Sequence, residues 1–244
     1  MSAWPYPAFV AHRGAGKLAP ENTLAAMRAG YAHGYRMFEF DVKLSGDGVP
    51  FLLHDDTLDR TTNGSGRADA LDWSELAKLD AGSWHSLAYV GETVPTFTAV
   101  ARWAIANGAM CNVEIKPVPG RERETGAAVA LDARTLWKNA DVAPLLSSFS
   151  EEALAAARDA VPELPRALLL ERIPADWESR LSHLGCIAID ADFREIDQAL
   201  VDDAHRAGFK VLTYTPNDPT VIATLSAWRV DVVITDAVDV VKPA

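Results

Sequence analysis

The sequence predicts an α/β fold, a (β/α)8 TIM barrel with a small insertion after the second strand. Short runs of apolar and β-branched residues occur eight times, and segments with helical spacing separate most of them. The length of 244 residues also matches the roughly 250 residues that such a barrel uses. An open, doubly wound sheet is the alternative arrangement of the same elements.

The strands are predicted from apolar stretches bounded by turn residues. They are expected at 8–12, 37–42, 111–116, 145–149, 166–170, 186–190, 210–214 and 231–235. Helical spacing predicts helices at 22–32, 96–107, 125–138, 150–161, 196–207 and 219–228. Two of these have clear N-caps, Thr96 and Ser150, and two acidic residues follow Ser150 in the first turn.

The interval from 43 to 95 is too long for one strand-helix unit. It begins with a Gly-Asp-Gly turn, which predicts a hairpin of 42–44 and 49–54. With the turn centred between Gly46 and Asp47, residue 41 faces 52 and residue 39 faces 54, which brings His54 beside Glu39. We expect the rest of the interval to be an elaboration over the barrel mouth, within a single domain that spans 1–244.

The charge balance excludes several classes of partner. The chain has 34 Asp and Glu against 23 Lys and Arg, a net charge of −11, which repels polyanions. We therefore expect no nucleic-acid partner and no stable membrane association. Cys111 and Cys186 lie in apolar runs, typical of buried thiols. The N-terminus lacks a signal-peptide pattern and no long apolar run occurs, which predicts a cytoplasmic protein, either a monomer or a homo-oligomer.

The second strand, MFEFDVKL, carries two carboxylates on one face. Glu39 and Asp41 are two residues apart, whereas Phe38 and Phe40 point to the other side. If the phenylalanines face the helices, the carboxylates enter the barrel, where they require a cation. The alternative is an exposed edge strand with alternating charges.

A third carboxylate follows in NVEIKP, where Glu114 and Lys116 share one face. Oxygen ligands from Glu39, Asp41 and Glu114 favour one hard divalent ion, Mg²⁺, Mn²⁺ or Ca²⁺, over zinc. Lys116 then holds a substrate anion or simply neutralises Glu114.

The first strand ends in AHRGAG, which places His12 and Arg13 at the end of the barrel where chemistry occurs. Neither phosphate-loop pattern fits, because positions 11 and 19 are alanine. Arg13 nevertheless matches phosphate oxygens. With His54 of LLHDD, His12 supplies two imidazoles for general acid-base catalysis, although either alone is equally consistent with a polar strand terminus. Asp55 is expected to support His54.

The order AHRG, PENT, EFDVKLSGDGVPFLLHDDTLDRTTNG, EIKP and ITD resembles the glycerophosphodiester phosphodiesterases over nearly the whole chain. The resemblance implies metal ligation by Glu39, Asp41 and Glu114, and acid-base catalysis by His12 and His54. It also implies phosphate contacts from Arg13 and Lys116. Glu21 and Asn22 match PENT, where Asn22 acts in the site or caps the next helix.

Two segments depart from the family pattern. Tyr214 replaces a frequent tryptophan, so we expect a tyrosine to form the aromatic wall that binds substrate. Residues 229–232 replace a frequent Gly-x-Asp-Gly. Both changes affect the expected substrate fit rather than the chemistry. Asp190 and Asp192 either face the pocket or begin a helix.

The function implied by the resemblance is metal-dependent hydrolysis of small-molecule glycerophosphodiesters to sn-glycerol 3-phosphate and an alcohol. By similarity to related phospholipases C, His12 is expected to be the base and His54 the acid. The nucleophile is water or the glycerol 2-hydroxyl. The alternatives are a phospholipase-type phosphodiesterase on lipids, an enolate-forming metal enzyme, and a non-catalytic phosphodiester-binding protein.

Overall fold

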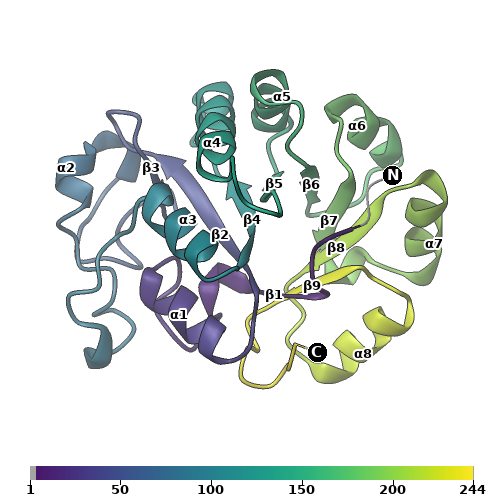
Figure 1. The fold of residues 1–244 in the computed structure, drawn as a ribbon, viewed down its shortest axis with the longest axis horizontal. Helices are drawn as coiled ribbons and strands as arrows, with labels where there is room; N and C mark the ends of the chain where they lie inside the picture. Colours follow the sequence, from purple (N-terminus) through teal and green to yellow (C-terminus); the bar gives the residue numbers. More distant parts are fainter. Residues whose placement is uncertain (1–3, 244) are drawn as a thin grey trace.

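The computed structural model describes residues 4–243, which form a closed parallel barrel surrounded by helices (Figure 1). The order of the barrel strands is β1-β9-β8-β7-β6-β5-β4-β2, and β1 pairs with β2 to close the ring. This confirms the predicted (β/α)8 fold and rules out an open sheet. The strands are β1 (Phe9–Ala11), β2 (Met37–Leu44), β4 (Met110–Ile115), β5 (Leu145–Ser148), β6 (Arg166–Leu170), β7 (Ala188–Asp192), β8 (Lys210–Tyr214) and β9 (Val232–Thr235).

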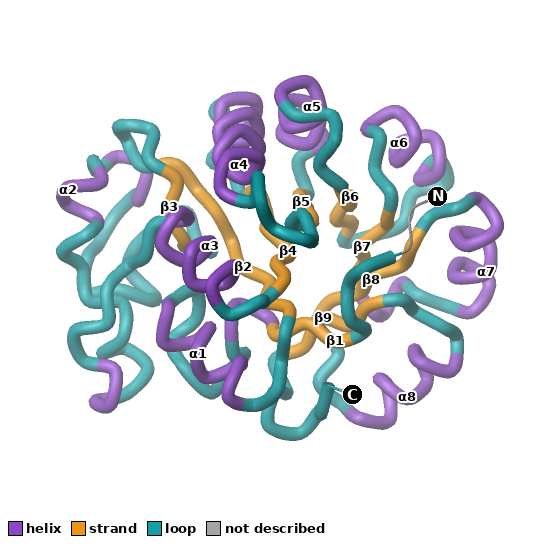
Figure 2. Tube along the Cα trace, in the orientation of Figure 1, coloured by secondary structure: helices purple, strands orange, loops and turns teal. Residues whose placement is uncertain are grey.

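The helices lie outside the strands, and loops join the two layers at both ends (Figure 2). They are α1 (Leu24–Ala32), α2 (Trp73–Leu76), α3 (Phe97–Ala106), α4 (Glu122–Leu136), α5 (Glu151–Ala160), α6 (Trp177–Leu184), α7 (Gln198–Ala207) and α8 (Pro219–Ala227). Short 3₁₀ turns occur at His12–Gly14, Ala68–Ala70, Leu87–Tyr89 and Phe193–Glu195. The predicted helices all form, and α2 and α6 are additional ones. The expected caps Thr96 and Ser150 accept hydrogen bonds from Ala99 and Ala153.

The insertion begins with a hairpin of β2 and β3 (Pro50–Leu52), as predicted, but the predicted register is wrong by one residue. Val42 pairs with Leu52, so position 41 faces 53 instead of 52. The reason is the turn: the Ser45 amide donates to the Val49 carbonyl at 3.0 Å, which leaves three residues in the loop. Gly48 supplies the left-handed conformation there, with φ of +81°.

The inside of the barrel is divided into an apolar lower layer and a polar upper end. The lower layer contains Val10, Met37, Leu145, Ala167, Ala188, Leu212, Val232 and Ile234, all buried. The alternate residues face the helices, where Phe38 packs on Trp103 and Phe40 on Phe97. Because the phenylalanines point outward, the carboxylates of β2 point inward, as predicted.

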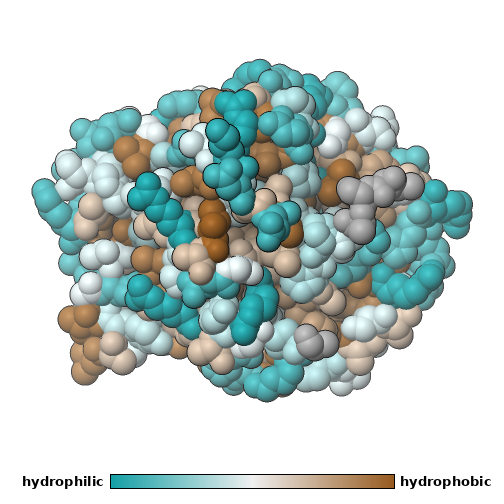
Figure 3. Space-filling view, viewed as in Figure 1, coloured by the Kyte–Doolittle hydropathy of each residue, from teal (hydrophilic) through white to brown (hydrophobic). Residues whose placement is uncertain are grey.

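The surface is largely hydrophilic on the face shown in Figure 3, with an apolar tip over the insertion at lower left. The exposed large apolar residues of the insertion are Trp84, Leu87 and Val90. Both cysteines are buried free thiols, as expected. Among residues 4–243, no helix has both the length and the apolar character that a bilayer crossing requires.

Candidate active site

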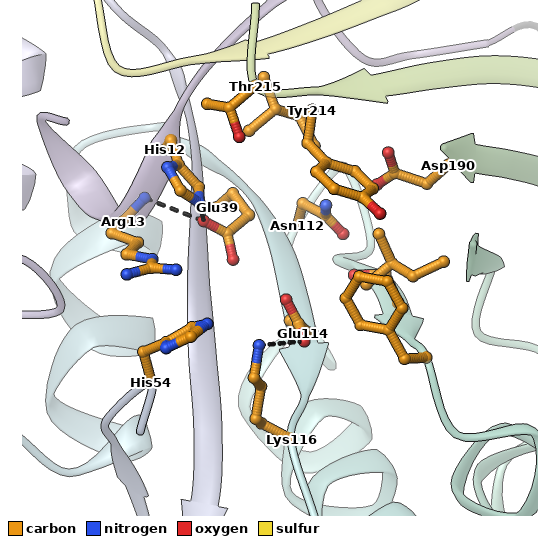
Figure 4. A pocket seen from close by; sticks show the side chains of 14 residues that line it. His12, Arg13, Glu39, His54, Asn112, Glu114, Lys116, Asp190, Tyr214 and Thr215 are labelled. Atoms are coloured by element: carbon orange, nitrogen blue, oxygen red, sulfur yellow. Dashed lines mark hydrogen bonds and ion pairs between the residues drawn. The ribbon is translucent and has the colours of Figure 1, made fainter. Parts of the chain in front are cut away.

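A cavity of about 130 Å³ opens at the carboxyl ends of the barrel strands. Figure 4 shows that its side chains come from opposite sides of the barrel and point toward one another. All but one of the eight expected site residues line it. The exception, Asp41, still contacts a lining residue, since its Oδ1 lies 3.3 Å from the Lys116 ammonium. The lining residues are His12, Arg13, Glu39, His54, Asn112, Glu114, Lys116, Ser147, Phe149, Leu169, Asp190, Tyr214, Thr215 and Ile234.

Three buried carboxylates converge beside this cavity. Glu39, Asp41 and Glu114 each offer an oxygen within 4.8 Å of the other two. Strand register causes this, because Asp41 pairs with Glu114 across β2 and β4, and Glu39 lies two residues before Asp41. The Oε1 atom of Glu39 has no hydrogen-bond partner among the described residues. Such a set of hard oxygen donors with an unpartnered buried atom suits a divalent metal ion.

The carboxylates differ in how readily they ionise. Burial, followed by the charges of Asp41 and Glu114, raises the pKa of Glu39 well above its usual range. Burial and Asp41 likewise raise the pKa of Glu114 to about 7. Burial opposes ionisation of Asp41 too, but Lys116 and Arg13 outweigh it and hold the pKa of Asp41 below its usual range. Without a metal ion, Glu39 and Glu114 therefore tend to keep a proton, because Arg13 and Lys116 do not neutralise three ionised carboxylates so close together.

Two cations face the carboxylate cluster. The Lys116 ammonium lies 2.9 Å from Glu114 Oε1 and 3.3 Å from Asp41 Oδ1. Arg13 Nε lies 3.6 Å from Asp41 Oδ2, and the Arg13 backbone amide donates to Glu39 Oε2 at 2.9 Å. Both side chains are about one-fifth exposed on the cavity side. Each cation can therefore contact an anion in the cavity while it remains beside the cluster.

The two histidines are held by carboxylates at their Nδ1 atoms. His12 Nδ1 lies 2.7 Å from Asp236 Oδ1, and His54 Nδ1 lies 2.7 Å from Asp55 Oδ1. The support of His54 by Asp55 is as expected. When Nδ1 donates to its carboxylate, Nε2 is free to accept or donate a proton. His12 Nε2 lies 3.8 Å from Glu39 Oε2, at the edge of the cluster.

Three residues that support the site, Asp236, Asn217 and Arg60, were not predicted from the sequence. Asp236 holds His12 and also accepts from Asn217 Nδ2 at 3.2 Å. Arg60 joins Asp55 to Glu21, which in turn pairs with Arg13. Asp236 and Arg60 both stand inside motifs quoted above, ITD and LDRTT, and that was the only sequence signal for them.

Asn22 bonds the cluster residue Asp41 and does not cap the next helix. Its amide donates to Asp41 Oδ2 at 2.8 Å and accepts from the Asp41 backbone at 3.1 Å. Thr23 caps α1 instead, accepting from Ala26. Of the two acidic residues left open, Asp190 faces the cavity and Asp192 caps the 3₁₀ turn after β7.

The wall opposite the histidines is aromatic. Tyr214 and Phe149 pack edge to face with ring centroids 5.7 Å apart. The Tyr214 hydroxyl donates to the Leu170 carbonyl at 3.0 Å, so the departure from tryptophan leaves no unpaired polar group. The wall formed by Tyr214 and Phe149 can contact the apolar side of a small ligand.

Comparison with known proteins assigns the family. The model of the glycerophosphoryl diester phosphodiesterase family matches residues 12–240. The chain belongs to this family. A glycerophosphodiester phosphodiesterase of Caldanaerobacter subterraneus is 30% identical over 232 residues, covering 93% of each protein. One from Bacillus subtilis is 30% identical over 246 residues, covering 94% of this chain and 83% of that one.

A solved structure extends the family comparison to the fold. It is an Oleispira antarctica phosphodiesterase in complex with the product sn-glycerol-3-phosphate, 39% identical with a TM-score of 0.89. The match covers 95% of this chain and 93% of that one. The predicted resemblance to the family is confirmed.

Proposed function

We propose that this member of the family hydrolyses glycerophosphodiesters to sn-glycerol 3-phosphate and a free alcohol. The observation that carries the proposal is the convergence of three carboxylates, two cations and two carboxylate-held histidines on one small cavity. The product bound to the Oleispira protein supports the same substrate class.

In the proposed site, Glu39, Asp41 and Glu114 hold one divalent ion, Mg²⁺, Mn²⁺ or Ca²⁺. The ion, when bound, offsets negative charge that develops on the phosphoryl group. Arg13 and Lys116 bind the phosphate oxygens, because both lie on the cavity side of the cluster. Tyr214 contacts the substrate from the aromatic wall.

The proton transfers are assigned to the histidines. His12 Nε2 removes a proton from the nucleophile, which is water or the glycerol 2-hydroxyl, as its oxygen forms a bond to phosphorus. His54 Nε2 gives a proton to the alcohol oxygen as the phosphorus–oxygen bond to that alcohol breaks. When the 2-hydroxyl is the nucleophile, this step gives a cyclic phosphate, and water then opens it to sn-glycerol 3-phosphate with the two proton transfers reversed. Asp236 and Asp55 keep the two rings oriented and in the required tautomer.

An assay of ion-depleted protein tests the proposal. Protein treated with EDTA is incubated with glycerophosphocholine, glycerophosphoethanolamine and glycerophosphoinositol, and single ions are restored in turn. We expect release of sn-glycerol 3-phosphate, measured by a coupled glycerophosphate dehydrogenase, only when an ion is present. Tight binding without turnover in all three ions would instead indicate a phosphodiester-binding protein.

A phospholipase-type activity is the second candidate and is separated by its substrate. Vesicles of phosphatidylcholine mixed with anionic phosphatidylglycerol serve as the comparison, and release of choline or phosphocholine is measured, because a phospholipase leaves no free sn-glycerol 3-phosphate. The net charge of −11 gives the chain little attraction to such anionic vesicles, so we expect no release from them. A cytoplasmic location and the oligomeric state stay predictions, which fractionation and light scattering test.

A further inference from the structure

Three buried polar side chains form a floor directly above the apolar layer of the barrel, beside the carboxylate cluster, and nothing in the proposed chemistry uses them. They are Asn112, Ser147 and Asp190, each exposed by 1% or less. Both carboxylate oxygens of Asp190, both amide atoms of Asn112 and the Ser147 hydroxyl have no hydrogen-bond partner among residues 4–243. Burying unpaired polar groups costs free energy, so five such atoms in one place indicate a ligand that pairs with them.

Side-chain alternation places this floor at the inner end of the cavity, because each of its residues is the next inward-facing one after an apolar residue of the lower layer. Those apolar residues are Met110, Leu145 and Ala188. Asn112 lies two residues before Glu114 on β4, on the same face, and Ser147 of β5 pairs in register with Glu114. Asp190 of β7 faces them from across the barrel, and Figure 4 shows Asn112 and Asp190 on the side away from His54. All three line the cavity, and the apolar layer of the barrel interior blocks any way out below them.

The size and chemistry of the floor fit a small neutral polyol. The cavity of about 130 Å³ is well below the roughly 300–1,000 Å³ of pockets that hold drug-sized ligands. A carboxyl, an amide and a hydroxyl together accept from and donate to alcohol groups. Burial raises the pKa of Asp190 well above its usual range, and the charge of Glu114 adds to this, which favours a neutral partner. Phe149 and Tyr214 cover the carbon side of such a ligand.

We infer that Asp190, Asn112 and Ser147 bind the terminal hydroxyl of the substrate's glycerol, the hydroxyl farthest from phosphorus. The inference rests on the proposed function, since the phosphate at the upper cluster directs the far end of the glycerol down to the floor. A glycerol acylated at that position has no room, because the floor is closed.

A pair of substrates differing by one hydroxyl tests this inference. The first is sn-glycero-3-phosphocholine, and the second is propane-1,2-diol 1-phosphocholine, which lacks only the terminal hydroxyl and keeps the 2-hydroxyl. We expect kcat/KM of the wild type to fall by roughly tenfold or more on the second substrate. 1-Acyl-lysophosphatidylcholine should not be turned over.

Variants of the floor give the second half of the test. Asp190→Leu and Ser147→Ala should lower kcat/KM on the first substrate and leave kcat/KM on the second nearly unchanged. The ratio of the two kcat/KM values, first substrate over second, should therefore approach one. Because Asp190→Leu replaces an unpaired buried group with an apolar one of similar size, its melting temperature should be unchanged or higher. Thr213→Val is the matched control, since Thr213 is buried in the adjacent strand but bonds the Ala191 carbonyl. Its ratio should equal that of the wild type.

The outcomes separate the two proposals. If the wild type hydrolyses both substrates equally, or if the variants keep its ratio, the inference is wrong and the proposed function stands. If Asp190→Leu melts lower and loses both substrates alike, the floor is structural and the inference is also wrong. If the wild type hydrolyses neither substrate, with any of the three ions, the proposed function fails and the inference with it.

Discussion

His12 and His54 each have a carboxylate at Nδ1, but those carboxylates differ in what else they contact. Asp236 is shared with Asn217, whereas Asp55 is bound by Arg60. Burial, opposed in part by Asp41, lowers the pKa of His54. A lower pKa makes the protonated ring a stronger acid, but it also leaves fewer rings protonated at neutral pH, so this shift alone does not distinguish the acid from the base.

Removal of either imidazole tests the acid-base assignment. His12→Ala and His54→Ala should each lower kcat by roughly 10²- to 10⁴-fold, with Mn²⁺ affinity by calorimetry retained. Asp236→Asn should lower kcat by a smaller factor, because the ring remains but its tautomer is no longer fixed.

The matched control is a second histidine-carboxylate pair outside the cavity. His205 Nε2 lies 2.7 Å from Asp231 Oδ2, so His205→Ala removes a similar contact and should leave kcat unchanged. Full turnover by His12→Ala or His54→Ala would reject the role of that residue.

Metal binding should depend on pH through the raised pKa of Glu114, about 7. A carboxyl with a raised pKa is protonated below that pH, and a proton competes with the metal ion. The Kd for Mn²⁺ should therefore fall as pH rises from 5 to 7, by up to about tenfold per pH unit for each competing proton. Glu39, whose pKa is raised as well, adds to this slope.

Titration calorimetry of ion-depleted protein at several pH values provides the measurement. Glu114→Gln should bind more weakly and with a shallower slope. Glu124→Gln, a change at an exposed carboxylate paired with Arg121, should keep the wild-type slope. An affinity that does not change between pH 5 and 8 would contradict the raised pKa.

At the level of single residues, the sequence predicted the site residues whose positions follow from the alternation of side chains along a strand. Glu39, Asp41 and Glu114 converge because side chains alternate along each strand. Asp236 and Arg60 could not be predicted this way, since their partners lie 224 and 39 residues away along the chain. Such contacts depend on loop paths that no local pattern encodes.

Helices α4 and α5 pack closely against each other at a glycine of α4, Gly126. A Cβ atom at Gly126 would lie 2.1 Å from the Ala153 carbonyl oxygen, closer than any contact allows. In an exposed helix, Gly→Ala stabilises by roughly 1 kcal/mol. At Gly126 the overlap of the added Cβ with the backbone of α5 should make the substitution destabilising instead.

Gly126→Ala is therefore expected to destabilise the protein by about 1–3 kcal/mol, measured as the free energy of unfolding in urea. Ser182→Ala in α6 is the comparison, because Ser182 is an exposed helical position with no side-chain hydrogen bond among the described contacts. That change should alter the free energy by less than about 0.5 kcal/mol. A stabilised Gly126→Ala variant would show that the two helices can separate without cost.

Two features of the helices and strands were not predicted correctly from the sequence, and both have local causes. Helix α6 was not predicted because its eight residues, WESRLSHL, bury only Leu181 and Leu184. The hairpin register was wrong because a Gly-Asp-Gly sequence is compatible with two- and three-residue turns, and only the conformation of Gly48 distinguishes them.

For the molecule as a whole, the bound ion should act as a stabiliser. An ion that binds only the folded state at 100 times its Kd adds about 2.7 kcal/mol, which for a chain of this size raises the melting temperature by about 5–10 °C. Differential scanning fluorimetry with EDTA and with each ion measures the shift. The double variant Glu39→Gln with Glu114→Gln should show almost none, and an equal shift in that variant would place the ion elsewhere.

The overall architecture was the most predictable level. Eight strands separated by helices restrict the topology strongly, and the count itself indicated closure. The closing contact could not be seen in the sequence, because β1 and β2 share only the pair Ala11 and Phe38. Closure is a property of eight tilted strands together rather than of any one segment.

The sealed lower layer of the barrel also determines how a reaction cycle must end. If the glycerol occupies the inner end, as inferred above, it departs after whatever lies nearer the solvent, so we expect the alcohol to leave first and sn-glycerol 3-phosphate to leave last. The last product and the next substrate therefore compete for the same form of the protein, the free enzyme. Initial rates with added sn-glycerol 3-phosphate should show purely competitive inhibition, while the alcohol should inhibit only noncompetitively.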